Sequence, residues 1–198
     1  MPMFPLGAVL FPHMPLRLRV FEERFLIMMS AVIKEHAGEF GVVLIERGHE
    51  VGGGEVRFTT GTTAEIVDLG AHSGYVALEA RGTRRFDVVE WQGDKPYPQA
   101  EVVERPELVW ERALEPLRAE AEARVRRALA QASEFSENIW PADLELSADP
   151  IAAAWQLAGI APIGELDQIR LLRSATMEEL LRSVIELTAD VQRDFFGF

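Results

Sequence analysis

Two pairs of polar side chains have a spacing that could support catalysis. Ser30 and Lys34 are four residues apart, so on a helix they would share a face, and a serine activated by a neighbouring amine is a possible nucleophile. A lysine must be desolvated to act as a base, however, and the pattern places Lys34 on the polar side of its helix. Glu22 and Glu23 could be paired carboxylates, but neighbours on a helix point about 100° apart. We therefore expect a surface pair and helix-start charges, not a catalytic site.

The residues that could hold a metal or a nucleotide do not form a recognisable pattern. The sequence has no cysteine, and its four histidines have no ligand spacing; they are His13, His36, His49 and His72. The glycines Gly52–Gly54 are followed by Glu55, without the lysine and hydroxyl that a phosphate-binding loop requires. We expect a flexible loop there, and no cofactor and no metal.

Basic residues are few, and their neighbours are acidic. Arg84 and Arg85 are adjacent on a predicted strand, so they should point to opposite faces, and a structural salt bridge is favoured over an anion site. Arg124, Arg126 and Arg127 form the densest basic cluster, but Glu120 and Glu122 precede it. We expect a solvated helix face.

Composition limits the classes of function. The chain has 198 residues, 48% hydrophobic and 26% charged, which is ordinary for a soluble globular protein. Its formal net charge of −12, with both halves acidic, argues against binding of nucleic-acid backbones. The longest apolar stretch, at about 151–163, is too short to span a bilayer, and the start has no basic n-region. We expect a cytoplasmic protein without a membrane segment.

The first half has the patterns of a β-rich domain with one helix. Val9–Phe11 lies between prolines and is predicted as a short edge strand, and residues 16–20 alternate in the manner of a half-buried strand. A helical stripe then follows, ended by Gly38; it contains Phe21, Phe25, Met28, Met29 and Val32. Further strands are predicted at residues 40–45, 62–69, 75–81, 85–91 and 97–104, with a bend or bulge at Gly82.

The second half is predicted to be helical. A long amphipathic helix is expected from Glu107 to about Ala132, and Pro116 marks the place where it could bend. Asp149-Pro150 is a strong helix start, and Thr176 with Glu179 forms a capping box. The helix at 165–173 is expected to turn Leu166, Ile169 and Leu172 (or Leu171) inward. The character of the chain changes at Arg105, so we expect domains at residues 1–104 and 105–198.

The opening stretch F-P-L-x-x-V-L-F-P-x-x-x-P-L-R-x-x-x-F-E-x-R-F resembles the start of the Lon protease substrate-binding domain. The matching residues are Pro5, Leu6, Phe11, Pro12, Pro15, Leu16, Phe21, Glu22 and Arg24. The resemblance continues through F-G-V-V-L-I, G-T-T-A-E-I, R-G-T-R-R-F and Y-P-Q-A-E-V, and more loosely through P-I-G-E-L-D-Q-I-R-L-L. It implies an α+β protein: a PUA-like twisted β-rich domain (a pseudo-barrel with one helix) followed by a bundle of about four helices.

The resemblance implies a non-catalytic module that binds unfolded or exposed apolar polypeptide, as an adaptor in protein quality control that could work with a protease or chaperone. The given sequence contains neither the ATPase nor the protease motifs of that family. A cleft at the junction of the two domains is one expected site. The tail phenylalanines Phe195, Phe196 and Phe198 either pack on the protein or form an exposed patch for a partner. Two other readings stay open: RNA binding, which PUA-like folds often perform, and an enzyme or small-ligand pocket.

Overall fold

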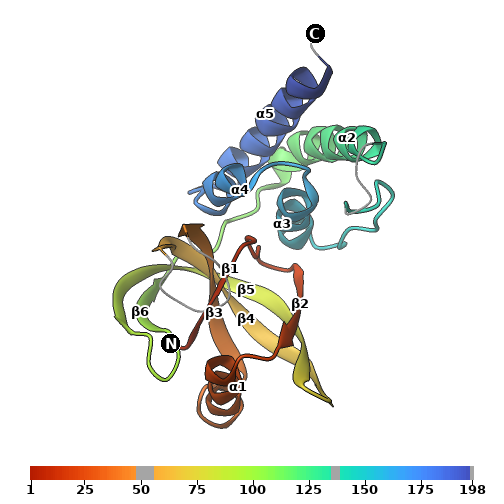
Figure 1. Cartoon of the computed structure of the whole chain (residues 1–198). Coiled ribbons are helices and arrows are strands. Elements are labelled where there is room, and N and C mark those ends of the chain that lie inside the picture. Colours follow the sequence, from red (N-terminus) through yellow and green to blue (C-terminus); the bar gives the residue numbers. More distant parts are fainter. Residues whose placement is uncertain (48–55, 135–138, 197–198) are drawn as a thin grey trace. The chain divides into compact units, whose positions relative to one another are not determined.

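The computed structural model describes residues 1–47, 56–134 and 139–196, except for the side chains of residues 47 and 190–196. Two compact units are present, Met1–Glu107 and Leu108–Phe198. The first unit combines a mixed sheet with one helix, and helices make up the second (Figure 1), so the α+β class is confirmed. The domain boundary expected after Glu104 stays a prediction.

The first unit has six strands and helix α1. The strands are β1 (Met3–Leu6), β2 (Pro15–Val20), β3 (Glu39–Arg47), β4 (Val56–His72), β5 (Tyr75–Gly93) and β6 (Gln99–Glu104), and α1 covers Glu23–Glu35. Their order in the sheet is β1-β3-β4-β5-β2, and β6 also pairs with β5. Only the β1–β3 pair is parallel among these pairings. Figure 1 shows α1 at one end of the curved strands.

The pairings of the first unit close into a ring at the N-terminus. An antiparallel bridge joins Pro2 to Gln99, the residue that begins β6. The amine of Met1 donates to the Ala100 carbonyl at 2.8 Å, and the Ala100 amide donates back to Met1 at 3.0 Å. Burial lowers the pKa of that amine. Inside the ring, Phe86 packs with Met3, Val43 and Ala100, all fully or almost fully buried.

Strand β5 is long enough to pair with two different strands along one edge. Its first part, at residues 76–81, pairs with β2, and its last part, at residues 86–93, pairs with β6. The two parts meet at Gly82, where the register against β4 shifts between Thr62 and Ala64. The bend or bulge expected at Gly82 is therefore confirmed. The expected strand break is wrong, because β5 continues through it.

The segment Val9–Phe11 is not a strand, which corrects the sequence-based prediction; the first strand is β1 at Met3–Leu6. Leu10 and Phe11 are buried nevertheless. The carbonyl of Leu10 accepts a hydrogen bond from the Thr62 hydroxyl at 2.6 Å, and His13 and Met14 bond with the backbone of Gly82. The Phe11 carbonyl accepts from the Met14 amide at 3.2 Å, so these carbonyls are bonded outside a strand ladder.

Helix α1 carries most of the predicted stripe. Phe25, Met28, Met29 and Val32 are buried, and Gly38 ends the segment with a φ of 82°. Phe21 is the exception: it precedes the helix, whose N-cap is Glu22, and it is 56% exposed. The i, i+4 spacing of Phe21 and Phe25 suggested a shared face, but Phe21 belongs to the connection between β2 and α1.

The second unit contains α2 (Glu115–Ala132), α3 (Pro150–Ile160), α4 (Glu165–Leu172) and α5 (Met177–Phe196), and a 3-10 turn at Arg112–Leu114 precedes α2. The long helix expected from Glu107 therefore begins later, because Pro116 fits only in the first turn. The caps are as predicted: Asp149 accepts from the Ala152 amide at 2.8 Å, and Thr176 accepts from Glu179 at 3.1 Å.

Apolar side chains form the interior of the helical unit. Trp155, Leu157, Ile160, Leu171 and Leu180 are among the fully buried residues. Leu166 was expected to face inward and is instead 71% exposed. Ile169, Leu171 and Leu172 already supply the buried face of the short helix α4, so the first turn is left at the surface.

Gly82 should be intolerant of a side chain. An added Cβ would collide with the carbonyl oxygen of Phe11, so we expect Gly82→Ala to lower the free energy of unfolding by about 1–3 kcal/mol. Urea unfolding followed by circular dichroism measures this. Gly70→Ala in β4 is the control, since its Cβ would find its nearest neighbour at 3.4 Å. Equal losses for the two variants would contradict the close approach at Gly82.

Candidate functional site

A groove lies between β1, β2 and the start of α1 in the first unit. Its volume is about 160 Å³. The lining residues are Phe4, Leu6, Arg17, Leu18, Arg19, Val20, Phe21, Glu22 and Phe25. Four of them, Arg17–Val20, are consecutive in β2, so the groove follows that strand.

Stacked aromatic rings form the fixed wall of the groove. The rings of Phe4 and Phe25 lie 4.1 Å apart between centroids and 13° from parallel, and Phe40 packs against Phe4 at 6.2 Å. On the other side of Phe25, the guanidinium of Arg24 lies 4.4 Å from the ring centroid and bonds with Glu22 at 3.1 Å. Such contacts hold the rings in one arrangement, so the groove is preformed rather than opened by a ligand.

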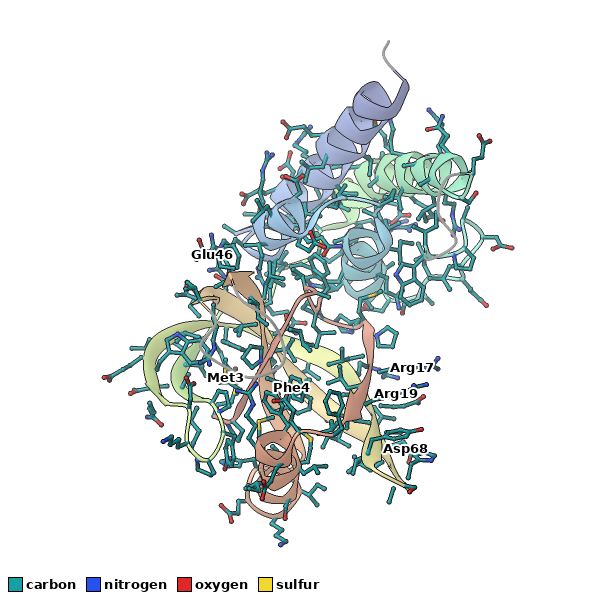
Figure 2. All side chains as sticks on the ribbon, viewed as in Figure 1. Met3, Phe4, Arg17, Arg19, Glu46 and Asp68 are labelled. Carbon is teal, nitrogen blue, oxygen red and sulfur yellow. The ribbon has the colours of Figure 1, made fainter. Side chains whose placement is uncertain are left out.

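Apolar and basic side chains alternate along the β2 side of the groove. Leu18 and Val20 are half-buried and buried, and Arg17 and Arg19 are exposed. Figure 2 shows Arg17 and Arg19 extending from β2 in the same direction, with Phe4 among the strands. The exposed Phe21 directly follows β2 and also lines the groove. The predicted alternation of residues 16–20 is confirmed, and it gives the groove an apolar side and a cationic side.

The two arginines differ in their partners. Arg17 forms an ion pair with Glu79 of β5 at 3.0 Å, and both side chains are largely in solvent. Arg19 lies over the ring of Tyr75, with its guanidinium carbon 5.6 Å from the centroid. None of the described residues forms an ion pair with Arg19. Its charge is therefore available to a ligand in the groove.

A second, larger hollow of about 410 Å³ is lined by Val56, Arg57, Trp91, Gly93 and Asp94. Arg57 lies over Trp91 at 4.5 Å and forms an ion pair with Asp94 at 2.8 Å. Arg57 is thus already engaged by two other lining residues. Val56, the first lining residue, directly follows residues 48–55, which are not described. This hollow therefore supports no ligand assignment.

The other basic residues have structural roles, as predicted. Arg84 is exposed and pairs with Glu39 and Glu104 at 2.8 Å each, and the hydrogen bond to Glu39 contributes most to raising its pKa. Arg85 points to the opposite face, is buried and donates to the Pro106 carbonyl at 2.9 Å. Burial, followed by the charge of Arg105, lowers the pKa of Arg85 to about 10. The cluster at Arg124–Arg127 is offset by ion pairs with Glu120 and Glu122.

The remaining candidates from the sequence do not come together. Ser30 and Lys34 are exposed on α1. Among the described residues, no group of three or more histidine or acidic side chains could hold a metal, and no helix is long and apolar enough to cross a membrane. The side chains of Phe195 and Phe196, and Phe198 altogether, lie outside the described residues, as does the predicted loop at Gly52–Gly54.

Sequence reasoning missed the groove. The helical spacing predicts Phe21 in the buried stripe of α1, and the alternation predicts Arg17 and Arg19 only as the polar half of a strand. One signal was available: Glu22 and Glu23 mark the first turn of a helix, which places Phe21 before it. The second wall, Phe4 and Leu6, could not be paired with β2 without knowing the sheet order.

Comparisons with known proteins agree on one family. The family described as the ATP-dependent protease La (LON) substrate-binding domain matches residues 1–190. A Lon N-terminal domain protein from Xanthomonas campestris has 25% identity and a TM-score of 0.66, over 94% of this chain and 96% of that one. The N-terminal domain of the Mycobacterium avium complex Lon protease has 21% identity and a TM-score of 0.67, over 96% and 97%. No curated protein matched significantly.

Proposed function

The chain belongs to the family of ATP-dependent protease La (LON) substrate-binding domains, and we propose that it binds polypeptide in the groove between β1, β2 and α1. The groove supports this proposal because it is apolar on one side and follows a strand edge. Exposed apolar segments of unfolded chains need such a surface, since burying them removes apolar area from water. The observation that carries the proposal is the exposure of Phe21 in a groove that also contains the stacked rings of Phe4 and Phe25.

The same proposal includes the detailed architecture and the cellular role that the family resemblance implies. We propose that the ring of strands is a PUA-like pseudo-barrel, that the second unit is a four-helix bundle, and that the whole acts as a non-catalytic adaptor in protein quality control. A protease or chaperone would be its natural partner. The exposed positions of Ser30 and Lys34 support a non-catalytic role. The expected cleft at the junction of the domains stays a prediction.

RNA binding is less well supported as an alternative. The net charge of −12 would repel a phosphate backbone, and Arg84, Arg85 and Arg126 are engaged in ion pairs or hydrogen bonds with neighbouring groups. Small-ligand pockets usually measure about 300–1,000 Å³, and the groove, at about 160 Å³, is smaller.

Replacing Phe21 should weaken binding of an unfolded client without affecting the fold. A permanently unfolded probe, fluorescently labelled reduced and carboxymethylated α-lactalbumin, is titrated with the chain and followed by fluorescence anisotropy. Because an apolar side chain of this size contributes about 1.5–3 kcal/mol when buried, we expect Phe21→Ser to raise Kd by about tenfold or more.

The matched control is Ile33→Ser, which removes an apolar side chain of similar exposure, 54%, from α1 outside the groove. It should leave Kd within about twofold, and both variants should unfold at the same urea concentration as the parent chain. The groove assignment is wrong if Phe21→Ser binds as the parent does. The proposed function itself is wrong if the parent chain does not bind the unfolded probe.

The tail phenylalanines Phe195, Phe196 and Phe198 remain a second proposed contact for a partner. Deleting residues 195–198 should weaken client binding and leave the urea midpoint unchanged if these rings contact the client. Leu166→Ser, which removes an exposed leucine from the same unit, is the control. A deletion that lowers stability and leaves binding unchanged would show that the tail packs on the protein instead.

A further inference from the structure

We propose that the client segment binds as an added strand on the open edge of β2, and that the preferred segment alternates apolar and acidic residues. This inference rests on the proposed function and specifies its geometry and chemistry. Three features of the first unit carry it: the direction of the β2 backbone groups, the inability of β1 to compete, and the separation of charge from apolar surface along the groove.

The backbone of β2 presents hydrogen-bonding groups to the groove. The Gly82 amide donates to the Met14 carbonyl at 2.9 Å, so residue 14 faces β5. Bonded and non-bonded pairs alternate in an antiparallel ladder, so Leu16 and Leu18, opposite Ala80 and Leu78, also bond with β5. The amides and carbonyls of Arg17 and Arg19 must therefore point away from β5, toward the other edge of β2.

That other edge has no strand partner in the described part of the chain, since β5 is the only strand that pairs with β2 there. Arg17 and Arg19 are two residues apart, which is the spacing at which one neighbouring strand would take up both pairs of groups. These two arginines line the groove together with Leu18 and Val20 of the same strand. A strand on this edge would thus lie along the groove.

Strand β1, on the other side of the groove, cannot offer the same edge. The Met3 amide already donates to the Pro98 carbonyl at 2.8 Å. Two residues later, the nitrogen of Pro5 faces the same edge and carries no hydrogen. An incoming segment can therefore form a ladder with β2 only, and β1 contributes side chains from Phe4 and Leu6.

Charge decides which segment fits. In an added strand, side chains on one face would lie beside Arg17 and Arg19, and those on the other face would lie beside Leu18 and Val20, where Phe4 and Phe25 form the apolar wall. Acidic residues suit the first face and apolar residues the second. Arg19 has no ion-pair partner among the described side chains, and Arg17 could exchange its exposed partner Glu79 for a ligand carboxylate.

The same arginines disfavour a second copy of the chain as the occupant. Pairing two β2 edges would place arginines of one copy beside arginines of the other, and charged edge residues are a common means of preventing such association. The net charge of −12 opposes acidic segments in general, so the attraction must be local to Arg17 and Arg19. The test therefore uses substitutions at these positions.

The experiment measures the affinity of the full chain for a labelled, capped twelve-residue peptide of alternating valine or phenylalanine and glutamate. In one derivative the backbone amide of every glutamate is N-methylated. In the other, the backbone amide of every valine or phenylalanine is N-methylated. Amides of alternate residues point to opposite edges of a strand, so only one of the two sets can bond with β2. We therefore expect one derivative to lose at least tenfold in affinity and the other to bind within threefold of the parent peptide. If both derivatives bind as the parent peptide does, or if both are lost, strand addition is wrong.

A double variant, Arg17→Glu with Arg19→Glu, tests the charge arrangement. Both side chains are exposed, so the fold should persist, and the glutamate peptide should lose at least tenfold in affinity while a lysine-containing version gains. Arg170→Glu with Arg182→Glu changes the net charge equally at two exposed, ion-paired arginines of the second unit, and it should leave affinity within twofold. Equal effects of the two double variants would overturn the assignment to β2.

The unfolded α-lactalbumin probe, measured in parallel, separates this inference from the proposed function. Binding of the unfolded protein without binding of the alternating peptide would overturn strand addition and leave polypeptide binding intact. Absence of binding for both would overturn both. Binding of both, with loss in the Arg17 and Arg19 variant and in one N-methylated peptide, would support the inference.

Discussion

The close approach of Phe11 to Gly82 is the constraint on which the first unit depends. Because Gly82 has no side chain, the segment before β2 can cross β5 and bond with its backbone on both sides of the glycine. Strand β5 then pairs with β2 before the crossing and with β6 after it. The later part closes the ring with the N-terminus, and the earlier part pairs with one edge of β2, whose other edge has no strand partner among the described residues.

That open edge brings the backbone, the aromatic wall and the charge together. Phe4 comes from β1, Phe25 from α1, and Arg17 and Arg19 from β2, and their arrangement follows from the path of one stretch of chain, Phe4–Phe25. The stacked rings keep the apolar side preformed, so a ligand does not have to order it on binding. Exposed arginines on such an edge disfavour pairing with other copies, as charged edge residues generally do.

The sequence predicts features that depend on local interactions. The cap at Asp149, the capping box at Thr176 and the alternation of β2 each need only neighbouring residues, and each is confirmed. Sequence-based prediction fails where contacts with distant segments determine the local structure. Val9–Phe11 has the composition of a strand, but its Leu10 carbonyl accepts from the Thr62 hydroxyl and its Phe11 carbonyl accepts from the Met14 amide, outside any ladder. Phe21 has helical spacing with Phe25, but it lies outside α1, and the groove beside it requires β1 and β2 to be neighbours.

Amide hydrogen exchange of the chain, with and without the unfolded client, shows directly whether the client pairs with β2. A client paired with β2 would bond with the amides of Arg17 and Arg19, so we expect peptides from residues 15–21 to exchange at least tenfold more slowly in the complex, while α4 is unchanged. Protection confined to other surfaces, with β2 exchanging as it does in the free chain, would show that the client binds elsewhere.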